Sequence, residues 1–227
     1  MDCGTRARRL DLTLAFFGRL LRTGLGVNVI TFSNLLKGLC EAKRTDEAFN
    51  VLLHRMPELG CVPNVFSYSI VLKGFCDNRE SQRALELLRK MAEKGAGCSP
   101  DVISYNTVID GFFKEGEVAK ACNLLNGMTE HGISPNLVTY TSSIAALCKA
   151  RAMSKAEVVL GQMADKGVRP DNNTYNCLIY GYSSRGQWKQ AVRVFNEMTS
   201  QGRYCYMELI NVFPLQAWKN QGSKRCF

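Results

Sequence analysis

The chain has 227 residues, of which 46% are apolar and 22% are charged, and its formal net charge is +9 at pH 7. No uninterrupted apolar run approaches the length of about 18 residues that a membrane-spanning helix needs, so the sequence predicts no membrane segment. The composition is typical of a soluble helical protein, and the length allows one or two compact domains.

The first 28 residues predict only part of a structural repeat. Residues 1–10 are too few for a helix, and their basic side chains indicate a solvated end rather than a transit peptide. The segment from Leu12 to Arg22 then predicts a helix that Gly24 ends. We therefore expect 1–28 to be an N-terminal partial repeat that holds only the second helix.

Residues 29–202 contain five copies of one pattern, which begin at residues 29, 65, 102, 137 and 172 and are therefore 36, 37, 35 and 35 residues apart. A fixed period in this range is typical of a solenoid of small supersecondary units. We expect one elongated array with the repeats 29–64, 65–101, 102–136, 137–171 and 172–202.

The first half of each repeat predicts a helix. It opens with a hydroxyl residue, which we expect to be the N-cap, and an aromatic residue. In the third repeat the apolar residues Tyr105, Val108, Ile109 and Phe112 follow at helical spacing. A small residue recurs six positions after the aromatic, usually glycine, which costs about 1 kcal/mol in a helix relative to alanine. Its recurrence indicates that a neighbouring helix passes too close for a side chain.

The second half of each repeat predicts another helix, with a recurring alanine, a closing methionine, and then glycine and proline before Asn or Asp. Glycine just past a helix and proline soon after it form a standard stop signal. Neither helix buries its apolar face alone, so stacked pairs must build one continuous core. The predicted fold is all-α: a right-handed superhelical α-solenoid of stacked helix-turn-helix repeats, with the first helix of each repeat on the concave side.

Two repeats carry extra residues whose place can be predicted. In the first repeat Ala48 and Met56 are eight residues apart instead of seven, and a π-bulge in the second helix would absorb the extra residue. In the second repeat two extra residues lie in the loop at 96–99, where an insertion costs little.

Residues 203–227 show no repeat pattern and predict an off-pattern C-terminal tail without an assigned function. A chain that starts in mid-repeat and ends in such a tail has the pattern of one truncated at both ends, because solenoids normally carry polar capping helices. Leu14, Phe17 and Leu21 are then expected to leave apolar surface uncovered.

The residues that carry chemistry in other proteins form no recognisable site pattern in this sequence. Cys40, Cys76 and Cys148 share one helix position, which favours packing over reactivity. No CxxC occurs, and neither His54 nor His131 has neighbours that suggest a triad or a metal site. Phosphate-loop, dinucleotide-binding and zinc-protease motifs are also missing. We expect no catalytic residue, no metal, no cofactor and no small-molecule substrate, and so a protein that is not an enzyme.

The net charge of +9 favours a polyanionic partner, and single-stranded nucleic acid suits an elongated curved groove. Four lysines late in the first helices are candidate phosphate contacts, with plain surface solvation as the alternative interpretation: Lys37, Lys73, Lys114 and Lys149.

The combined pattern of residues 12–202 resembles the pentatricopeptide repeat. Its elements are V-x-[ST]-Y-N-x-[LVI]-I-x-G-[LF], the alanine and methionine of the second helix, and a closing G-x-x-P-[DN]. The related tetratricopeptide signature W-x₂-L-G-x₂-Y is missing. Phrases such as LLKGLCEAKRTDEA and VISYNTVIDGFF are similar to the P-type, plant fertility-restorer-like branch.

The resemblance implies an adaptor that binds single-stranded RNA selectively, one base per repeat, and acts in organellar transcript processing, stability or editing. It implies a mitochondrial location, with the chloroplast as the alternative, and other RNA-processing proteins are further candidate partners. Two other interpretations remain open: a protein-binding helical scaffold, and a truncated copy without retained activity.

The resemblance also assigns residues. It places base reading on the fifth and last residues of the repeats: Ser33 with Asn64, Ser69 with Asp101, Asn106 with Asn136, Thr141 with Asp171, and Asn176 alone. It places base stacking on the apolar second residues Ile30, Phe66, Ile103 and Val138, a pattern from which Asn173 departs.

The residue types at these positions predict a base order. A short Ser or Thr leaves room for a purine, and a longer Asn suits a pyrimidine. A closing Asp accepts a hydrogen bond from guanine or uracil, whereas a closing Asn can also donate, which suits adenine or cytosine. The predicted order is A, G, C or U, then G, with a weak pyrimidine preference in the fifth repeat.

Overall fold

The computed structural model describes residues 28–93 and 98–202, and nearer the N-terminus residues 11, 12, 14, 15, 17–19 and 22. Every regular element in these residues is helical and none of them lies in a strand, which confirms the predicted all-α class. None of the described helices is long and apolar enough to cross a membrane. The chain divides into two compact halves, Met1–Ile133 and Ser134–Phe227, called here the N-terminal and the C-terminal half.

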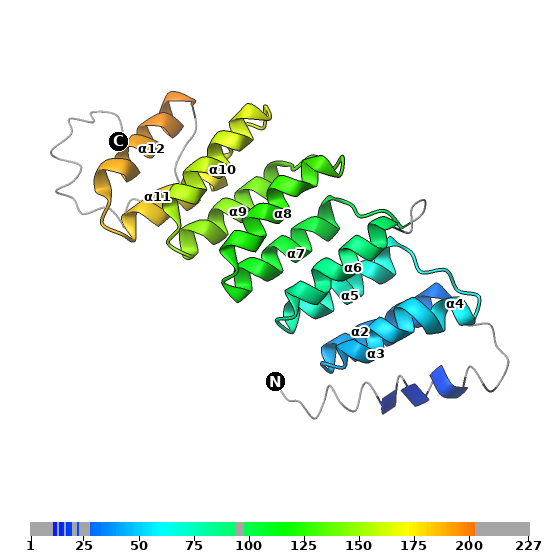
Figure 1. Cartoon of the computed structure of the whole chain (residues 1–227). Coiled ribbons are helices and arrows are strands. Elements are labelled where there is room, and N and C mark those ends of the chain that lie inside the picture. Colours follow the sequence, from blue (N-terminus) through cyan, green and yellow to red (C-terminus); the bar gives the residue numbers. More distant parts are fainter. Residues whose placement is uncertain are drawn as a thin grey trace. The chain divides into compact units, whose positions relative to one another are not determined.

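Each repeat is a hairpin of a first helix, helix A, and a second helix, helix B (Figure 1). In the N-terminal half the A helices are α2 (Val29–Glu41), α5 (Val65–Asp77) and α7 (Val102–Glu115). Its B helices are the continuous segment α3 (Thr45–Asn50), η1 (Val51–Arg55) and α4 (Met56–Glu58), followed by α6 (Ser81–Glu93) and α8 (Val118–Glu130). The C-terminal half contains the hairpins α9 (Leu137–Lys149) with α10 (Met153–Asp165), and α11 (Asn172–Ser183) with α12 (Trp188–Ser200).

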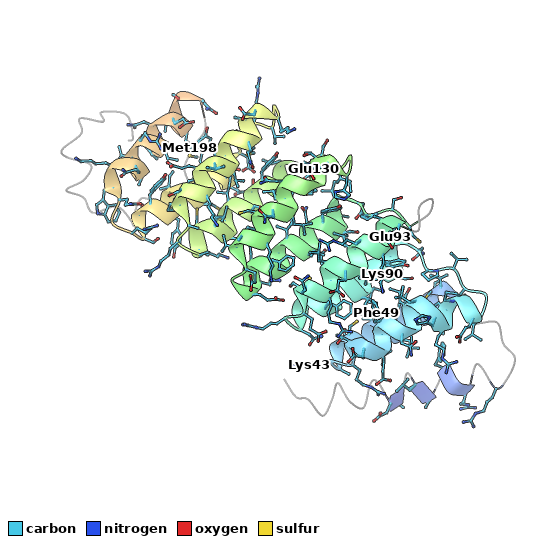
Figure 2. All side chains as sticks on the ribbon, viewed as in Figure 1. Lys43, Phe49, Lys90, Glu93, Glu130 and Met198 are labelled. Carbon is cyan, nitrogen blue, oxygen red and sulfur yellow. The ribbon has the colours of Figure 1, made fainter. Side chains whose placement is uncertain are left out.

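Within each half the hairpins stack through their A helices. Helix α5 contacts both α2 and α7, and α11 contacts α9. A B helix packs against its own A helix and the next one, as α6 does between α5 and α7 (Figure 1). Neighbouring B helices also meet through side chains: Lys90 Nζ of α6 lies 5.0 Å from the ring centroid of Phe49 of α3 (Figure 2).

The core consists of the residues that recur in every repeat. The aromatic residue of helix A is at most 3% exposed in all five repeats, and the alanine and methionine of helix B are 0% exposed in all five. Full burial of a methionine or phenylalanine side chain contributes roughly 1.5–3 kcal/mol. The periodic sequence pattern is therefore a pattern of core contacts, as predicted.

Within each half, consecutive A helices touch through a glycine of one helix and a cysteine of the other. A Cβ atom added at Gly74 would lie 2.4 Å from Cys40 Sγ, closer than real Cβ contacts come. Among the described residues the same contact joins Gly74 to Cys40, Gly111 to Cys76, and Gly181 to Cys148. The predicted close approach is confirmed, and its partner is the cysteine that shares one helix position. Burial raises the pKa of all three thiols to about 12, so they are protonated packing groups.

The extra residue of the first repeat is absorbed where the sequence predicts. Val51–Arg55 form one π-helical turn between α3 and α4. Because the wider turn takes up one residue, Ala48 before it and Met56 at its end both stay fully buried. The predicted insertion of the second repeat falls partly on residues 94–97, which lie outside the described residues.

The described residues between 11 and 22 are helical, and Phe17 packs edge-on against Phe32 with their ring centroids 5.1 Å apart. Leu14 and Phe17 are half-buried, so part of the predicted apolar surface is covered. Leu21 and the predicted tail at 203–227 lie outside the described residues.

The turn from helix A to helix B uses left-handed backbone at one position in all five repeats. This position follows the aromatic residue by eleven residues, and its φ lies between 59° and 83°: Lys43, Arg79, Gly116, Arg151 and Gly186. A residue other than glycine costs roughly 1–2 kcal/mol in this region. Three of the five turns are therefore strained by a basic residue.

We predict that Gly74→Ala destabilises the chain. The new Cβ meets Cys40 Sγ, and overpacking of this kind costs typically 1–3 kcal/mol, against a gain of about 1 kcal/mol from replacing a helical glycine, so we expect a net loss of up to about 2 kcal/mol. The measurement is chemical unfolding followed by circular dichroism.

Gly127→Ala is the matched control, since Gly127 lies in α8 with nothing within 4 Å of its added Cβ. It should stabilise the protein, and Cys40→Ala should recover part of the loss in the Gly74→Ala variant. If Gly74→Ala stabilises as Gly127→Ala does, the close approach of the helices is refuted.

Candidate functional site

Each A helix begins with an Asn or Asp whose side chain caps it. The Oδ1 atom accepts a hydrogen bond of 2.8–3.0 Å from the backbone N–H of the third helical residue. The five pairs are Asn28 with Thr31, Asn64 with Ser67, Asp101 with Ser104, Asn136 with Thr139, and Asp171 with Thr174. The predicted N-cap was therefore wrong. The hydroxyl residue is the third residue of the helix, and the cap is the closing residue of the preceding repeat.

The capping bond decides which side-chain atom the closing residue leaves free. A backbone N–H is a donor, so the atom that faces it must be an oxygen, and this fixes the amide orientation. Asn64 Oδ1 accepts from Ser67 N at 2.9 Å and Ser67 Oγ at 3.0 Å, which leaves the Nδ2 donor. Asp101 Oδ1 accepts from Ser104 N at 2.8 Å and Ser104 Oγ at 2.7 Å, which leaves the Oδ2 acceptor. A closing Asn thus offers a donor and a closing Asp an acceptor.

The fifth residues of the A helices lie about one turn beyond the cap. Ser33 Oγ donates to the carbonyl of Val29 at 2.8 Å, and Ser69 Oγ donates to that of Val65 at 2.8 Å. Each hydroxyl proton is therefore used within its own helix, which leaves oxygen lone pairs as acceptors. Asn106 is half-buried, and its Oδ1 is buried with no hydrogen-bond partner among the described residues.

In the fourth repeat the structure brings the two predicted base-reading residues together. Thr141 Oγ1 lies 2.7 Å from Thr174 Oγ1, and Thr174 Oγ1 donates to Asp171 Oδ1 at 2.8 Å. One buried hydroxyl of α11 therefore connects Thr141 of α9 with the cap of α11. Asn176, the fifth residue of α11, is half-buried. Asn106 and Asn136 belong to different halves of the chain, and each is placed only within its own half.

The predicted stacking residues are exposed apolar side chains. Ile30, Phe66, Ile103 and Val138 are 71%, 64%, 67% and 65% exposed. Each is the second residue of its A helix, three residues before the fifth, so both lie on one helix face. A single exposed apolar residue is ordinary. The same exposure at one helix position in four repeats contributes little to the core, which makes this position a candidate ligand contact within each repeat.

The fifth repeat departs from this pattern. Asn173 is exposed at the stacking position, and its Nδ2 lies 3.5 Å from Asp171 Oδ2. Sequence reasoning missed Tyr180, which is 54% exposed on the same helix, α11. Tyr180 follows Asn173 by seven residues and Asn176 by four, a spacing that places it on the same face. The sequence signal that could have identified Tyr180 is this spacing combined with an aromatic residue outside the core positions.

The four lysines predicted to contact phosphates are all exposed. Two of them form ion pairs within their own helices: Lys73 Nζ lies 3.3 Å from Asp77 Oδ2, and Lys114 Nζ lies 2.7 Å from Asp110 Oδ2. The hydrogen bond to Asp110 raises the pKa of Lys114. Their carboxylate partners reduce what Lys73 and Lys114 offer to a phosphate, so Lys37 and Lys149 are the stronger candidates.

Neither histidine belongs to an A helix. His131 Nδ1 lies 2.8 Å from the carbonyl oxygen of Gly127 at the end of α8, and His54 lies in the π-helical turn. Among the described residues no three His, Cys, Asp or Glu side chains are arranged to hold a metal ion.

Comparison with known proteins identifies the repeat. The model of the PPR repeat family matches residues 27–77, 100–149, 137–183 and 171–205, and a second PPR repeat model matches residues 66–95. The chain is 55% identical over 93 residues to "Protein Rf1, mitochondrial" of Oryza sativa subsp. indica. That match covers 41% of this chain and 12% of the rice protein.

Solved structures share the fold. The crystal structure of the pentatricopeptide repeat protein PPR10 from maize matches with a TM-score of 0.73 and 24% identity, over 90% of this chain and 28% of that one. The same maize protein in complex with an 18-nt psaJ RNA element matches with a TM-score of 0.64 and 26% identity, over 78% of this chain and 26% of that one. The PPR domain of Arabidopsis thaliana protein-only RNase P 1 in complex with tRNA matches with a TM-score of 0.56 and 16% identity, over 74% of this chain and 88% of that one.

We predict that Asn64 supports the fold through its oxygen alone. Asn64→Ala removes the cap of α5 and should lower the free energy of unfolding by about 0.5–2 kcal/mol. Asn64→Asp keeps the capping oxygen and should be close to wild type in chemical unfolding. Asn34→Ala, at an exposed position within α2, is the control. If Asn64→Ala and Asn64→Asp lower the free energy of unfolding equally, the capping oxygen does not support α5.

Proposed function

The chain belongs to the pentatricopeptide repeat family, and on that basis we propose that it binds single-stranded RNA, one base per repeat, as an adaptor without catalysis of its own. One recurring observation supports the proposal. The second residue of each of the first four repeats is apolar and exposed, and the closing residue, which caps the next A helix, keeps a polar atom that the cap does not use. A base needs an apolar surface for its face and hydrogen-bonding atoms for its edge. The first four repeats supply both.

The hydrogen bonds already made within the protein support a base preference for the first two repeats. Ser33 offers an acceptor and Asn64 a donor, which complement the amino group and the ring N1 of adenine. Ser69 and Asp101 offer acceptors only, which complement the amino group and the N1–H of guanine. The proposed order therefore begins A, then G.

The remaining repeats extend this order. For the third repeat the residue type of Asn106 suits a pyrimidine and Asn136 keeps a donor, each within its own half of the chain, so the proposal there stays C or U. Thr141 and Asp171 again favour guanine. Asn176 gives the fifth repeat a weak pyrimidine preference, since it has no apolar partner at the second position. The complete proposal is A, G, C or U, then G.

The name of the rice relative places that protein in mitochondria, and we propose the same location and a role in transcript processing, stability or editing for this chain. The chain spans 12% of the rice protein and about a quarter of the maize one, so the role proposed for it is that of an RNA-binding segment. Other RNA-processing proteins are the partners that such an adaptor would bring to a transcript.

We predict that Asp171→Asn shifts the base preference of the fourth repeat from guanine toward adenine. The variant keeps the capping oxygen but replaces the free acceptor with a donor, which suits adenine N1. The difference in binding free energy between guanine and adenine should change by about 1–3 kcal/mol, by analogy with base discrimination in proteins that read DNA. The measurement is a competition between oligonucleotides that differ only at that base.

Asp101→Asn is the matched control, since it makes the same change in the second repeat and should alter only the base read there. If wild type and Asp171→Asn rank guanine and adenine alike, the base-reading assignment fails. The protein-binding scaffold then becomes the better interpretation of the exposed apolar residues.

We also predict salt-dependent binding of about micromolar affinity, because stacking contributes roughly 1–3 kcal/mol per base and association offsets part of it. The logarithm of the affinity should fall with the logarithm of the salt concentration by about 0.7 per phosphate contacted. Lys37→Gln should reduce this slope by about 0.7, and Lys73→Gln by less, since Lys73 pairs with Asp77. Binding that is indifferent to salt would argue against phosphate contacts.

A further inference from the structure

The hydroxyl of Thr174 is fully buried and lies between the two base-reading residues of the fourth repeat. It has one proton and two lone pairs. Its proton goes to Asp171 Oδ1 at 2.8 Å, because a carboxylate oxygen only accepts. The backbone N–H of Asp171 donates to one lone pair at 3.4 Å. The other lone pair is left for Thr141, whose Oγ1 lies 2.7 Å away.

This arrangement fixes the direction of the hydrogen bond between the two threonines. The Thr174 proton is already given to the carboxylate, so Thr141 must be the donor. With its own proton used, Thr141 Oγ1 has only lone pairs to offer a ligand. On Asp171 the capping oxygen Oδ1 already accepts from Thr174 N at 2.8 Å as well. The atom left is Oδ2, also an acceptor, which Asn173 Nδ2 approaches only to 3.5 Å.

We propose that Thr174 is a positioning residue for base choice: its buried hydroxyl takes the proton of Thr141 and binds Oδ1 of Asp171, which leaves Thr141 Oγ1 and Asp171 Oδ2 as acceptors for the fourth base. This inference rests on the proposed RNA binding and goes beyond it, because Thr174 itself need not touch the base. Two acceptors complement the edge of guanine, which carries N1–H and the amino group as adjacent donors. Adenine and cytosine each place a ring acceptor beside their amino group, so two acceptors fit them poorly.

The fourth repeat differs in this respect from the first two. Ser33 and Ser69 give their protons to carbonyl oxygens of their own helices. Thr141 gives its proton to the neighbouring helix α11 instead. Its side chain is therefore held by the same hydroxyl that holds the cap, and the two base-reading residues become one hydrogen-bonded unit.

The test is Thr174→Val, which keeps the buried volume and removes the hydroxyl. Thr141 then has a free proton, and Asp171 Oδ1 loses one of its two donors. The ratio of guanine to adenine affinity at the fourth base should fall by about two- to ten-fold, which corresponds to the loss of one net hydrogen bond. Thr174→Ser keeps the hydroxyl and should retain the wild-type ratio.

Thr139→Val is the matched control. Thr139 is the equally buried third residue of α9 and bonds to its cap Asn136 in the same way. Loss of the Thr139 hydroxyl should destabilise the start of α9 to a similar extent but leave the ratio of guanine to adenine affinity at the fourth base unchanged. A purely structural role of Thr174 would lower the affinity for both bases equally and leave their ratio as in wild type.

The outcomes separate this inference from the function on which it rests. If Asp171→Asn changes the ratio and Thr174→Val does not, RNA reading stands and the role of Thr174 is refuted. If wild type binds no RNA, or if Asp171→Asn ranks the two bases as wild type does, the proposed function itself fails. Should Thr174→Val not fold, Thr174→Cys provides a second variant, since its weak S–H donor should give an intermediate loss of the ratio.

Discussion

The cap at the start of each A helix is the interaction on which the rest of the structure depends. One Asn or Asp oxygen satisfies the N–H of the third helical residue, and this bond fixes where the helix begins. The start in turn sets the helix register, so that the second residue points outward and the fourth, the aromatic, enters the core. Because one atom of the capping side chain is bound, its other polar atom is held in a defined direction. A bond that stabilises the fold therefore also determines what the surface offers to a ligand.

The packing between hairpins holds these caps in place within each half. The glycine of one A helix lies against the cysteine of the preceding one, with no space for another side chain. In the N-terminal half polar contacts join neighbouring hairpins as well: Thr45 Oγ1 donates to Glu80 at 3.1 Å, and Ser81 Oγ donates to Glu115 at 2.5 Å. A binding surface built on such packed helices is preorganised, because little freedom of the groups that meet the ligand remains to be lost on binding.

The sequence predicts most of the fold and only part of the candidate site. The period, the hairpins and even the π-helical turn at Val51–Arg55 follow from residue spacing, since buried positions must recur when each repeat packs like the last. The cap was misassigned because Ser and Thr serve equally well as caps and as third residues, and spacing alone does not separate the two. The ion pairs of Lys73 and Lys114 join residues four apart on one helix, a spacing that sequence reading could have used. The bond from Thr141 to Thr174 joins different helices and depends on side-chain directions that no one-dimensional pattern contains. The strained left-handed turn at Arg79 could not be predicted from the sequence for a related reason, because the residue type does not indicate the backbone conformation.

The central claim is that bases stack on the exposed second residues of the A helices. Methyl NMR of isoleucine-labelled protein tests it directly, because a stacked base shifts the methyl signals beneath it upfield through its ring current. On addition of a short single-stranded RNA we expect upfield shifts at Ile30 and Ile103, which are 71% and 67% exposed. The buried Ile109 and Ile144, at 3% and 0% exposure, should change little. RNA that binds without shifting Ile30 and Ile103, or that shifts only methyls elsewhere, would contradict the account.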